Sequence, residues 1–316
     1  MTTVRQDSRV DRLPTLRYRP TVIVTNHPLR PSATSWSWDS IADLIRLRNQ
    51  SGTWLLMLPS LWSLVLATHG HPPLTLVGIF VLGAFVMRSL GVVLNDLADR
   101  HLDKQVSRTR HRPLADGRLT PRQARFIALI LTGCAAILVS TLNRMTMLLS
   151  PIALLLAAAY PFSKRWIHIP QAVLGIAFGW GTIMSWTAAR GTIDAPAWWL
   201  FGATICWAIA YDTIYALQDL EDDRRIGVKS SALFFGDALP AAVGVFLGGM
   251  VICLVMAGHS SGLRMEFYLT LASLSGLFVW QVRRLTVSVT PGAAFMLFRQ
   301  HVYAGVVVLL GIWWGT

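Results

Sequence analysis

The chain has 316 residues, of which 53% are hydrophobic and only 14% are charged. A soluble domain carries about 25% charged residues, so this composition excludes an ordinary soluble protein and favours a membrane protein with several spans. The formal net charge is +12. The basic residues fall between apolar segments, where orientation signals belong, so we expect no nucleic acid partner.

The first 38 residues differ from the rest of the chain. They are polar, rich in Arg and contain Pro, and they lack the apolar core of a secretory signal. We interpret residues 1–38 as a flexible cytoplasmic N-terminal extension and residues 39–316 as a transmembrane domain. A transit peptide is the alternative for the Arg-rich segment, although its Asp and Pro content disfavours one.

The remaining chain is a series of apolar segments. A bilayer core of about 30 Å needs about 20 apolar residues per helix. This length predicts an all-α, polytopic membrane bundle of about nine transmembrane helices, near residues 53–70, 75–98, 121–141, 145–161, 170–189, 196–220, 238–257, 266–284 and 293–315.

The connections between these segments alternate in charge. The second, fourth, sixth and eighth connections are basic, and the second holds Arg100, Lys104, Arg108, Arg110, Arg112, Arg118 and Arg122. The others contain at most one Arg or Lys. The positive-inside rule places the N-terminus and the basic loops in the cytoplasm, as in a bacterial inner or plasma membrane.

Two clusters of acidic residues follow the second and sixth apolar segments, on the cytoplasmic side. On an ideal helix with about 100° per residue, the first cluster shares one face through Asn95, Asp96, Asp99 and Asp103. By the same rule the second cluster shares a narrow face through Asp212, Asp219 and Asp223, and Glu221 points away.

Two facing sets of carboxylates repel each other unless a cation lies between them. Mg²⁺ binds few carboxylates together with waters and substrate phosphates, and ionisable groups within spans are functional candidates. The clusters therefore predict a metal–diphosphate site near the basic loops. The alternative is a pair of solvated helix ends whose acids pair with loop arginines.

The acidic segments resemble those of a known family. NDLADRHLD (95–103) matches the NDxxDxxxD motif of the UbiA superfamily of membrane prenyltransferases, DLEDD (219–223) matches its DxxxD motif, and YPFSK (160–164) matches its YxxxK pattern. The resemblance covers most of the chain, from about residue 41 to the C-terminus. Within the superfamily, the 4-hydroxybenzoate polyprenyltransferases are the most similar, through the segments RTRHRPLADG and YDTIYALQDLEDDRRIGVKSSALFFG. Residues 49–52 (NQSG) depart from the Lys-Pro-Ile-Gly run of many members, which affects the expected acceptor and not the reaction.

The resemblance implies a central cavity open to the cytoplasmic side and a Mg²⁺-dependent reaction. A polyprenyl group would pass from polyprenyl diphosphate to the ring carbon ortho to the hydroxyl of 4-hydroxybenzoate, in ubiquinone or plastoquinone biosynthesis. Membrane lipid is an expected partner, and no obligate protein partner is expected. The alternatives are another acceptor (homogentisate, dihydroxynaphthoate, chlorophyllide or haem), an ion-coupled secondary transporter, or a non-catalytic lipid-binding scaffold. A transporter site would usually lie at the bilayer midplane, unlike these acids.

The resemblance also implies roles for the acidic residues. Asn95, Asp99 and Asp103 would bind one Mg²⁺, and Asp219 and Asp223 would bind a second. Asp96 would be a further ligand or would hold Arg100. Asp99 and Asp219 are expected to be catalytic, and Asp212 would contact the acceptor, its hydroxyl or the departing proton.

Cationic and aromatic residues complete the expected site. Tyr160 and Lys164 lie one helical turn apart and would contact the diphosphate, unless they are an interfacial Tyr and a snorkelling Lys. Arg108 and Arg112 would close over the phosphates, or serve as orientation signals or phospholipid contacts, and Arg46 would lie near the diphosphate. Arg88, inside an apolar span, must be paired; it is an expected catalytic and substrate-binding residue that locks an Asp or takes the carboxylate of an aromatic acid. Interfacial anchoring is favoured over tunnel lining for Trp180, Trp186, Trp198 and Trp199.

Overall fold

The computed structural model describes residues 36–163 and 165–316, so the extension predicted for residues 1–38 lies almost wholly outside the described residues. In the described ranges the secondary structure is helical without any strand, which confirms the all-α class. The helices are α1 (Trp38–Leu44), α2 (Ser51–Ala67), α3 (Leu74–Asp99), η1 (Asp103–Gln105), α4 (Pro121–Ser140), α5 (Arg144–Ser163), α6 (Pro170–Arg190), α7 (Ala195–Ala216), η2 (Leu217–Asp219), α8 (Leu220–Ile226), α9 (Ser231–Phe235), η3 (Gly236–Ala238), α10 (Leu239–Ser260), α11 (Met265–Leu285) and α12 (Pro291–Gly315).

Each of the nine predicted spans coincides with one long helix. Seven helical stretches, which contain α3, α4, α5, α6, α7, α10 and α12, are long and apolar enough to cross a membrane. Helix α2 has 17 residues, and α11 carries Glu266, Arg283 and Arg284 near its ends. The chain is therefore an integral, multi-pass membrane protein, and the count of nine crossings stays a prediction.

The helices begin where the sequence supplies start signals. Pro lies in the first turn of α4, α6, α7, α10 and α12, where its missing N–H has no partner to lose. Thr120 forms a capping box with Gln123 at the start of α4. These caps fix where each helix leaves the basic or the short connecting loops.

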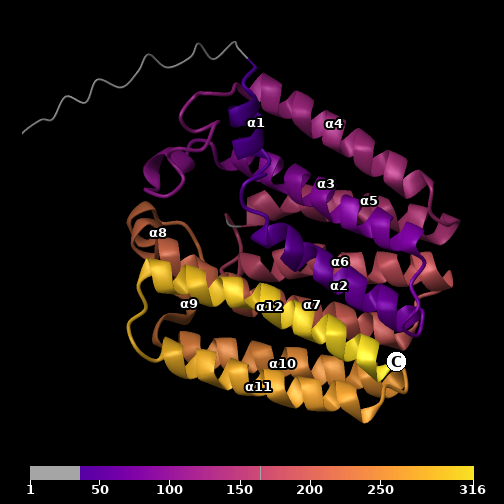
Figure 1. Ribbon diagram of the computed structural model, residues 1–316. Coiled ribbons are helices and arrows are strands. Elements are labelled where there is room, and N and C mark those ends of the chain that lie inside the picture. The colour runs from indigo at the N-terminus through magenta and orange to yellow at the C-terminus, as the bar shows by residue number, and fades with distance from the viewer. Residues whose placement is uncertain (1–35, 164) are drawn as a thin grey trace, which may run out of the picture. The chain divides into compact units, whose positions relative to one another are not determined.

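Helix α7 lies at the centre of the packing and contacts α2, α6, α10 and α12 (Figure 1). The ring centroids of Trp62 on α2 and Trp207 on α7 lie 4.9 Å apart in the hydrophobic core of the bundle. Their indole N–H groups donate to the Gly305 carbonyl at 2.8 Å and to His301 Nδ1 at 2.9 Å. Because buried indole N–H groups need acceptors, these bonds tie α2 and α7 to α12.

The outer helices α4 and α5 present apolar side chains away from the protein. Leu129, Ile137, Leu148 and Leu155 are all more than half exposed. Exposed apolar surface of this extent is unstable in water and stable in lipid. These two helices are therefore suited to face the bilayer.

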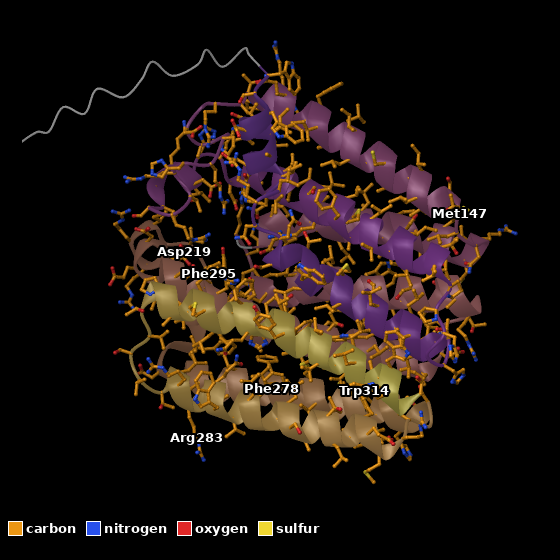
Figure 2. All side chains as sticks on the ribbon, in the orientation of Figure 1. Met147, Asp219, Phe278, Arg283, Phe295 and Trp314 are labelled. Carbon is orange, nitrogen blue, oxygen red and sulfur yellow. The ribbon has the colours of Figure 1, made fainter. Side chains whose placement is uncertain are left out.

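The two ends of the bundle differ in character. The loop after α3 and the short helix α8 lie at the same end (Figure 1), where the Ser107 N–H donates to Asp222 at 2.9 Å and Arg225 donates to the Gln105 carbonyl at 2.8 Å. Asp219 and Arg283 lie toward this end, and Met147 and Trp314 lie toward the other (Figure 2). Both acidic clusters therefore meet at one end of the bundle.

Candidate active site

A cavity of about 790 Å³ opens among α2, α3, α4, α5, α6 and α7. Its polar end is lined by Asn95 and Asp96 of the first acidic cluster, by the whole second cluster and by the loop after α3, whereas Asp99 and Asp103 do not line it. Its other part runs between apolar side chains that include Phe80, Ala84, Leu142, Leu154 and Met184. A charged end joined to an apolar arm suits a ligand with a charged head and a hydrocarbon chain.

The first acidic cluster lies where α3 ends. Asp96 and Asp99 are on its last turn and are 1% and 6% exposed. The helix ends at Asp99, and Asp103 lies beyond it in η1. The expectation that Asp103 continues one helical face is therefore wrong. Arg112 nevertheless keeps Asp103 close to Asp96, because its Nη1 donates to both carboxylates at 3.0–3.1 Å.

The second acidic cluster is also divided between helices, because α7 ends within it. Helix α7 ends at Ala216, η2 carries Asp219, and α8 carries Asp223. The single helical face expected for Asp212, Asp219 and Asp223 is therefore wrong. All three side chains still line the cavity, whereas Glu221, which was predicted to point away from them, is exposed and does not line it.

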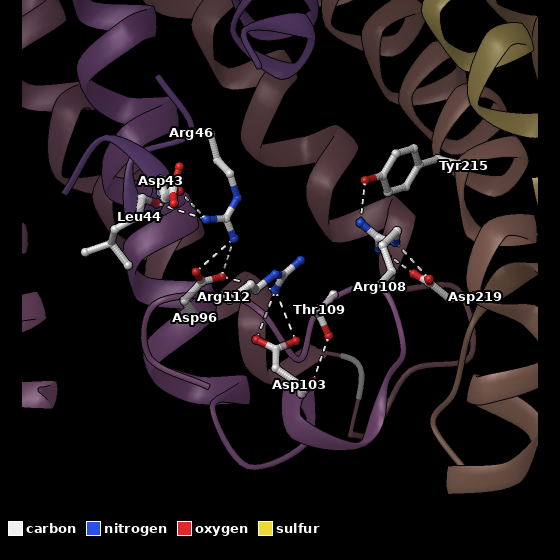
Figure 3. A network of polar contacts seen from close by, with 10 residues as sticks. All are labelled: Asp43, Leu44, Arg46, Asp96, Asp103, Arg108, Thr109, Arg112, Tyr215 and Asp219. Atoms are coloured by element: carbon white, nitrogen blue, oxygen red, sulfur yellow. Dashed lines mark hydrogen bonds and ion pairs between the residues drawn. The ribbon is translucent and has the colours of Figure 1, made fainter. Parts of the chain in front are cut away.

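Arginines bind the carboxylates at the polar end (Figure 3). Arg46 Nη2 donates to both oxygens of Asp96 at 2.8 Å. Arg108 binds Asp219 with two nitrogens and donates to the Tyr215 hydroxyl at 2.8 Å. The expected pairing of Asp96 with Arg100 is wrong, because Asp96 pairs with Arg46 and Arg112 while Arg100 donates to the Leu97 carbonyl at 2.9 Å.

Burial and pairing shift the ionisation of these groups. Burial raises the pKa of Asp103, although the neighbouring Arg112 guanidinium works in the opposite direction. Burial lowers the pKa of Arg108, but the hydrogen bond to Asp219 and the charges around it outweigh burial and raise it overall. Arg108 therefore stays cationic, and a cation near Asp103 favours its charged form.

Arg88 lies deeper in the same cavity, on α3. Its guanidinium rests against Gly52, where an added Cβ would lie 2.4 Å from Nε. It forms no hydrogen bond or ion pair with residues 36–163 or 165–316, so the alternative in which Arg88 locks an Asp finds no support there. A cation in such a setting calls for an anionic ligand.

The remaining predicted residues divide between the cavity and other places. Tyr160 and Asp212 line the cavity, whereas Lys164 lies outside the described residues. None of the four tryptophans considered for a tunnel lines it. Trp198 and Trp199 are exposed, and the buried Trp186 donates to Asp194 at 2.9 Å.

The structure adds residues that sequence reasoning missed. Asp43 accepts from Arg118 at 2.8 Å, and both line the cavity beside Arg46. Arg46 itself has φ +58, a left-handed conformation that is uncommon outside glycine, and its Nη1 donates to the Asp43 carbonyl at 2.7 Å. Lys229 and Gln171 also line the cavity. The signal for Lys229 was its place six residues after the second acidic cluster.

The donor set fits a magnesium–diphosphate site rather than an all-protein cage. Asn95 Oδ1 is enclosed and has no hydrogen-bond partner in the described part of the chain, so it remains able to coordinate a cation. No three His, Cys, Asp or Glu side chains gather there closely enough to hold a metal alone. Mg²⁺ needs only one or two carboxylates when substrate phosphates complete its shell.

Sequence comparison identifies close relatives. The chain is 42% identical over 269 residues to a 4-hydroxybenzoate octaprenyltransferase of Escherichia fergusonii, covering 85% of this chain and 92% of that one. It is 43% identical over 275 residues to the Pseudomonas aeruginosa protein of the same name, covering 87% and 92%.

Solved structures with the same fold were also found. A UbiA homolog from Aeropyrum pernix K1 aligns with a TM-score of 0.71 at 22% identity, over 82% of this chain and 96% of that one. A homolog from Archaeoglobus fulgidus bound to GPP and Mg²⁺ aligns with a TM-score of 0.63 at 16% identity, over 87% and 98%. Residues 56–302 match the UbiA prenyltransferase family, and with these relatives they show that the chain belongs to it.

Proposed function

We propose that this protein transfers a polyprenyl group from polyprenyl diphosphate to the ring carbon ortho to the hydroxyl of 4-hydroxybenzoate, as a step of quinone biosynthesis. The relatives that are 41–43% identical over most of the chain carry the name 4-hydroxybenzoate octaprenyltransferase. The observation that carries the proposal is the cavity, whose acidic and Arg-lined end continues into an apolar arm. A prenyl diphosphate has the same division of charge.

The acidic residues would hold the divalent metal. Asn95, Asp99 and Asp103 would serve one Mg²⁺, with Asp96 as a further ligand, and Asp219 and Asp223 would serve a second. The metal supplies positive charge that makes the diphosphate a better leaving group. Asn95 Oδ1, which is enclosed and has no hydrogen-bond partner among the described residues, supports this assignment.

The cations at the polar end would bind the diphosphate. Arg46, Arg108 and Arg112 surround the cavity entrance and already hold carboxylates bidentately or in pairs. The same planar fork suits phosphate oxygens. Tyr160, which lines the cavity, and Lys164 would add a hydroxyl and an ammonium group.

The acceptor would lie deeper, between Arg88 and Asp212. Arg88 would bind its carboxylate, because this guanidinium lines the cavity and forms no ion pair with the described residues. In the reaction the C–O bond of the allylic diphosphate breaks, and a C–C bond forms to the ring carbon ortho to the hydroxyl. The proton on that carbon leaves to a base, for which Asp212 is the candidate, and aromaticity returns.

The basic loops would place this end of the bundle in the cytoplasm of a bacterium, in its inner membrane. The loop after α3 carries most of the cations, and cytoplasmic loops have an excess of Lys and Arg. The exposed apolar sides of α4 and α5 would contact lipid. The prenyl tail would thus enter from the bilayer while its diphosphate stays at the aqueous edge.

Purified protein in lipid tests the proposal. We expect it to form a prenylated acid from a radiolabelled polyprenyl diphosphate and 4-hydroxybenzoate with Mg²⁺, and to lose this activity with EDTA. Diphosphate release with homogentisate or dihydroxynaphthoate instead would reassign the acceptor. The absence of metal-dependent release with every aromatic acceptor would contradict prenyl transfer and favour transport.

A further inference from the structure

Gln171 is a buried polar residue of the cavity that the proposed chemistry does not yet use. It lies in the first turn of α6, lines the cavity and is 4% exposed. Its Oε1 is enclosed and has no hydrogen-bond partner in residues 36–163 and 165–316. Leaving such an oxygen unbonded costs about 1–3 kcal/mol, so the terminal amide of Gln171 has hydrogen-bonding capacity that the described residues do not use.

The packing of α6 against α7 fixes the depth of Gln171. An added Cβ at Gly179 would meet the Phe201 ring and carbonyl, and one at Gly175 would meet Ile205 and Ala208. The two helices are antiparallel, so moving four residues from Gly175 toward the start of α6 corresponds to moving about four residues from Ile205 and Ala208 toward the end of α7. Gln171 therefore lies level with residues 209–212, where Asp212 lines the same cavity.

The packing of α6 against α2 gives the same depth independently. An added Cβ at Gly181 would lie 2.5 Å from Ser60 Oγ. Both helices begin at the end of the bundle that holds the basic loops and run in the same direction. Ten residues before Gly181 is Gln171, and ten residues before Ser60 is residue 50, so these two positions lie at the same level. Gly52 is within two residues of that level, or about 3 Å along the axis, and Gly52 touches Arg88.

We infer that the Gln171 amide recognises the ring hydroxyl of the aromatic acceptor, with its Oε1 accepting the hydroxyl proton in a hydrogen bond. This inference rests on the proposed transfer to 4-hydroxybenzoate. A half-turn of the terminal amide keeps its volume and exchanges oxygen for nitrogen, so Oε1 can face the cavity. With Arg88 on the carboxylate, Gln171 then binds the opposite end of the ring and selects a para hydroxyl group.

The hydrogen bond also bears on reactivity. A hydroxyl that donates to an amide oxygen becomes more electron-rich and directs attack by its ortho carbon. No bond to Gln171 is made or broken, so Gln171 is an acceptor-binding residue and Asp212 remains the candidate base. Asp212 lies at the same depth, which leaves the ortho carbon between the two groups.

The test compares acceptors in two glutamine variants. In the wild type we expect 4-methylbenzoate, which lacks the hydroxyl, to bind about 10- to 100-fold more weakly as an inhibitor than 4-hydroxybenzoate binds as a substrate. Gln171→Leu and Gln171→Met should raise the KM for 4-hydroxybenzoate by about the same factor, leave inhibition by 4-methylbenzoate unchanged, and leave the KM for the prenyl diphosphate unchanged.

Gln281 provides a matched control. It is fully buried in α11, and its Oε1 also lacks a partner among the described residues, but it does not line the cavity. Gln281→Leu should leave unchanged the ratio of the inhibition constant of 4-methylbenzoate to the KM for 4-hydroxybenzoate. The inference is overturned if Gln171→Leu keeps the wild-type ratio of the 4-methylbenzoate inhibition constant to the KM for 4-hydroxybenzoate, because the amide then does not bind the ring hydroxyl. If the wild type prenylates no 4-hydroxybenzoate, the proposed function fails and this inference fails with it.

Discussion

The contact between Gly52 and Arg88 offers a sharp test of the acceptor site. A Cβ at Gly52 would lie 2.4, 2.6 and 2.7 Å from Nε, Nη2 and Cζ of Arg88. Ordinary van der Waals contact begins near 3.4 Å, so the guanidinium must move by about 1 Å in Gly52→Ala. A displacement of about 1 Å at a positioning group costs about 100-fold in rate.

The change should act on the site and not on folding. Gly52 lies in the first turns of α2 and has no positive φ, and Ala is more favourable than Gly in a helix by about 0.5–1 kcal/mol. The Arg88 side chain is flexible and can yield. We therefore expect an unchanged or slightly higher thermal stability together with a loss of acceptor binding.

Steady-state kinetics with each substrate varied in turn provide the assay. We expect Gly52→Ala to lower kcat/KM for 4-hydroxybenzoate by about 10- to 100-fold and to leave the KM for the prenyl diphosphate near its wild-type value. Gly91→Ala is the control, because Gly91 lines the same cavity on α3 but an added Cβ meets no atom within 4 Å. Wild-type kcat/KM in Gly52→Ala would refute the role of Arg88, as would an equal loss in Gly91→Ala.

Four further substitutions probe the polar end. Asp99→Ala and Asp219→Ala should each reduce prenyl transfer by at least about 100-fold in a filter-binding assay, and wild-type rates in either would contradict the metal site. Arg108→Ala should raise the KM for the prenyl diphosphate by about 10-fold or more without changing the KM for 4-hydroxybenzoate; an effect on the acid alone would move Arg108 away from the phosphates. The hydrogen bond from the Ser107 N–H lowers the pKa of Asp222, so this contact is complete at neutral pH and is lost only as the pH falls below about 4. Asp222→Asn should therefore reduce activity by the same factor at about pH 6 and pH 8, and a factor that changes between them would contradict this assignment.

The arrangement of spans was predictable because it depends on local composition. Nine apolar segments became nine long helices, and the prolines and the Thr120 cap mark several starts. Each helix satisfies its own backbone hydrogen bonds, so apolar length alone is a strong signal for a membrane protein. Length alone does not fix the number of full crossings, because the 17-residue α2 is shorter than the about 20 residues that a bilayer core needs.

The sequence predicted that the two acidic clusters lie at the same end of the bundle, and the structure places both there, but the helical faces expected for them were wrong. No Gly or Pro lies between Asp99 and Asp103, or between Asp212 and Asp219, so the sequence gives no sign that α3 and α7 end there. The ends depend on contacts made elsewhere. Thr109 donates to the Asp103 carbonyl at 3.1 Å, and Asp222 accepts from Ser107, which is 115 residues away.

The pairing of charges was the part that sequence could least supply. Arg46 meets Asp96 across 50 residues, and Arg108 meets Asp219 across 111. Local spacing carries no information about such pairs. A metal–diphosphate site and a pairing of the acids with loop arginines were treated as alternatives. The observed pairs are compatible with both, since the loop arginines bind the acids and also line the cavity.

These pairs have a consequence for how the site binds its substrate. Asp96 is 1% exposed, and a buried carboxylate without a partner is strongly unfavourable, so its ion pairs with Arg46 and Arg112 stabilise it. Under the proposed function, a metal–diphosphate complex would bring both the cation that the acids need and the anion that the arginines need. Exchange of partners would then keep every charge paired at each stage, which would account for the acids and the arginines lying together at one end of an otherwise apolar bundle.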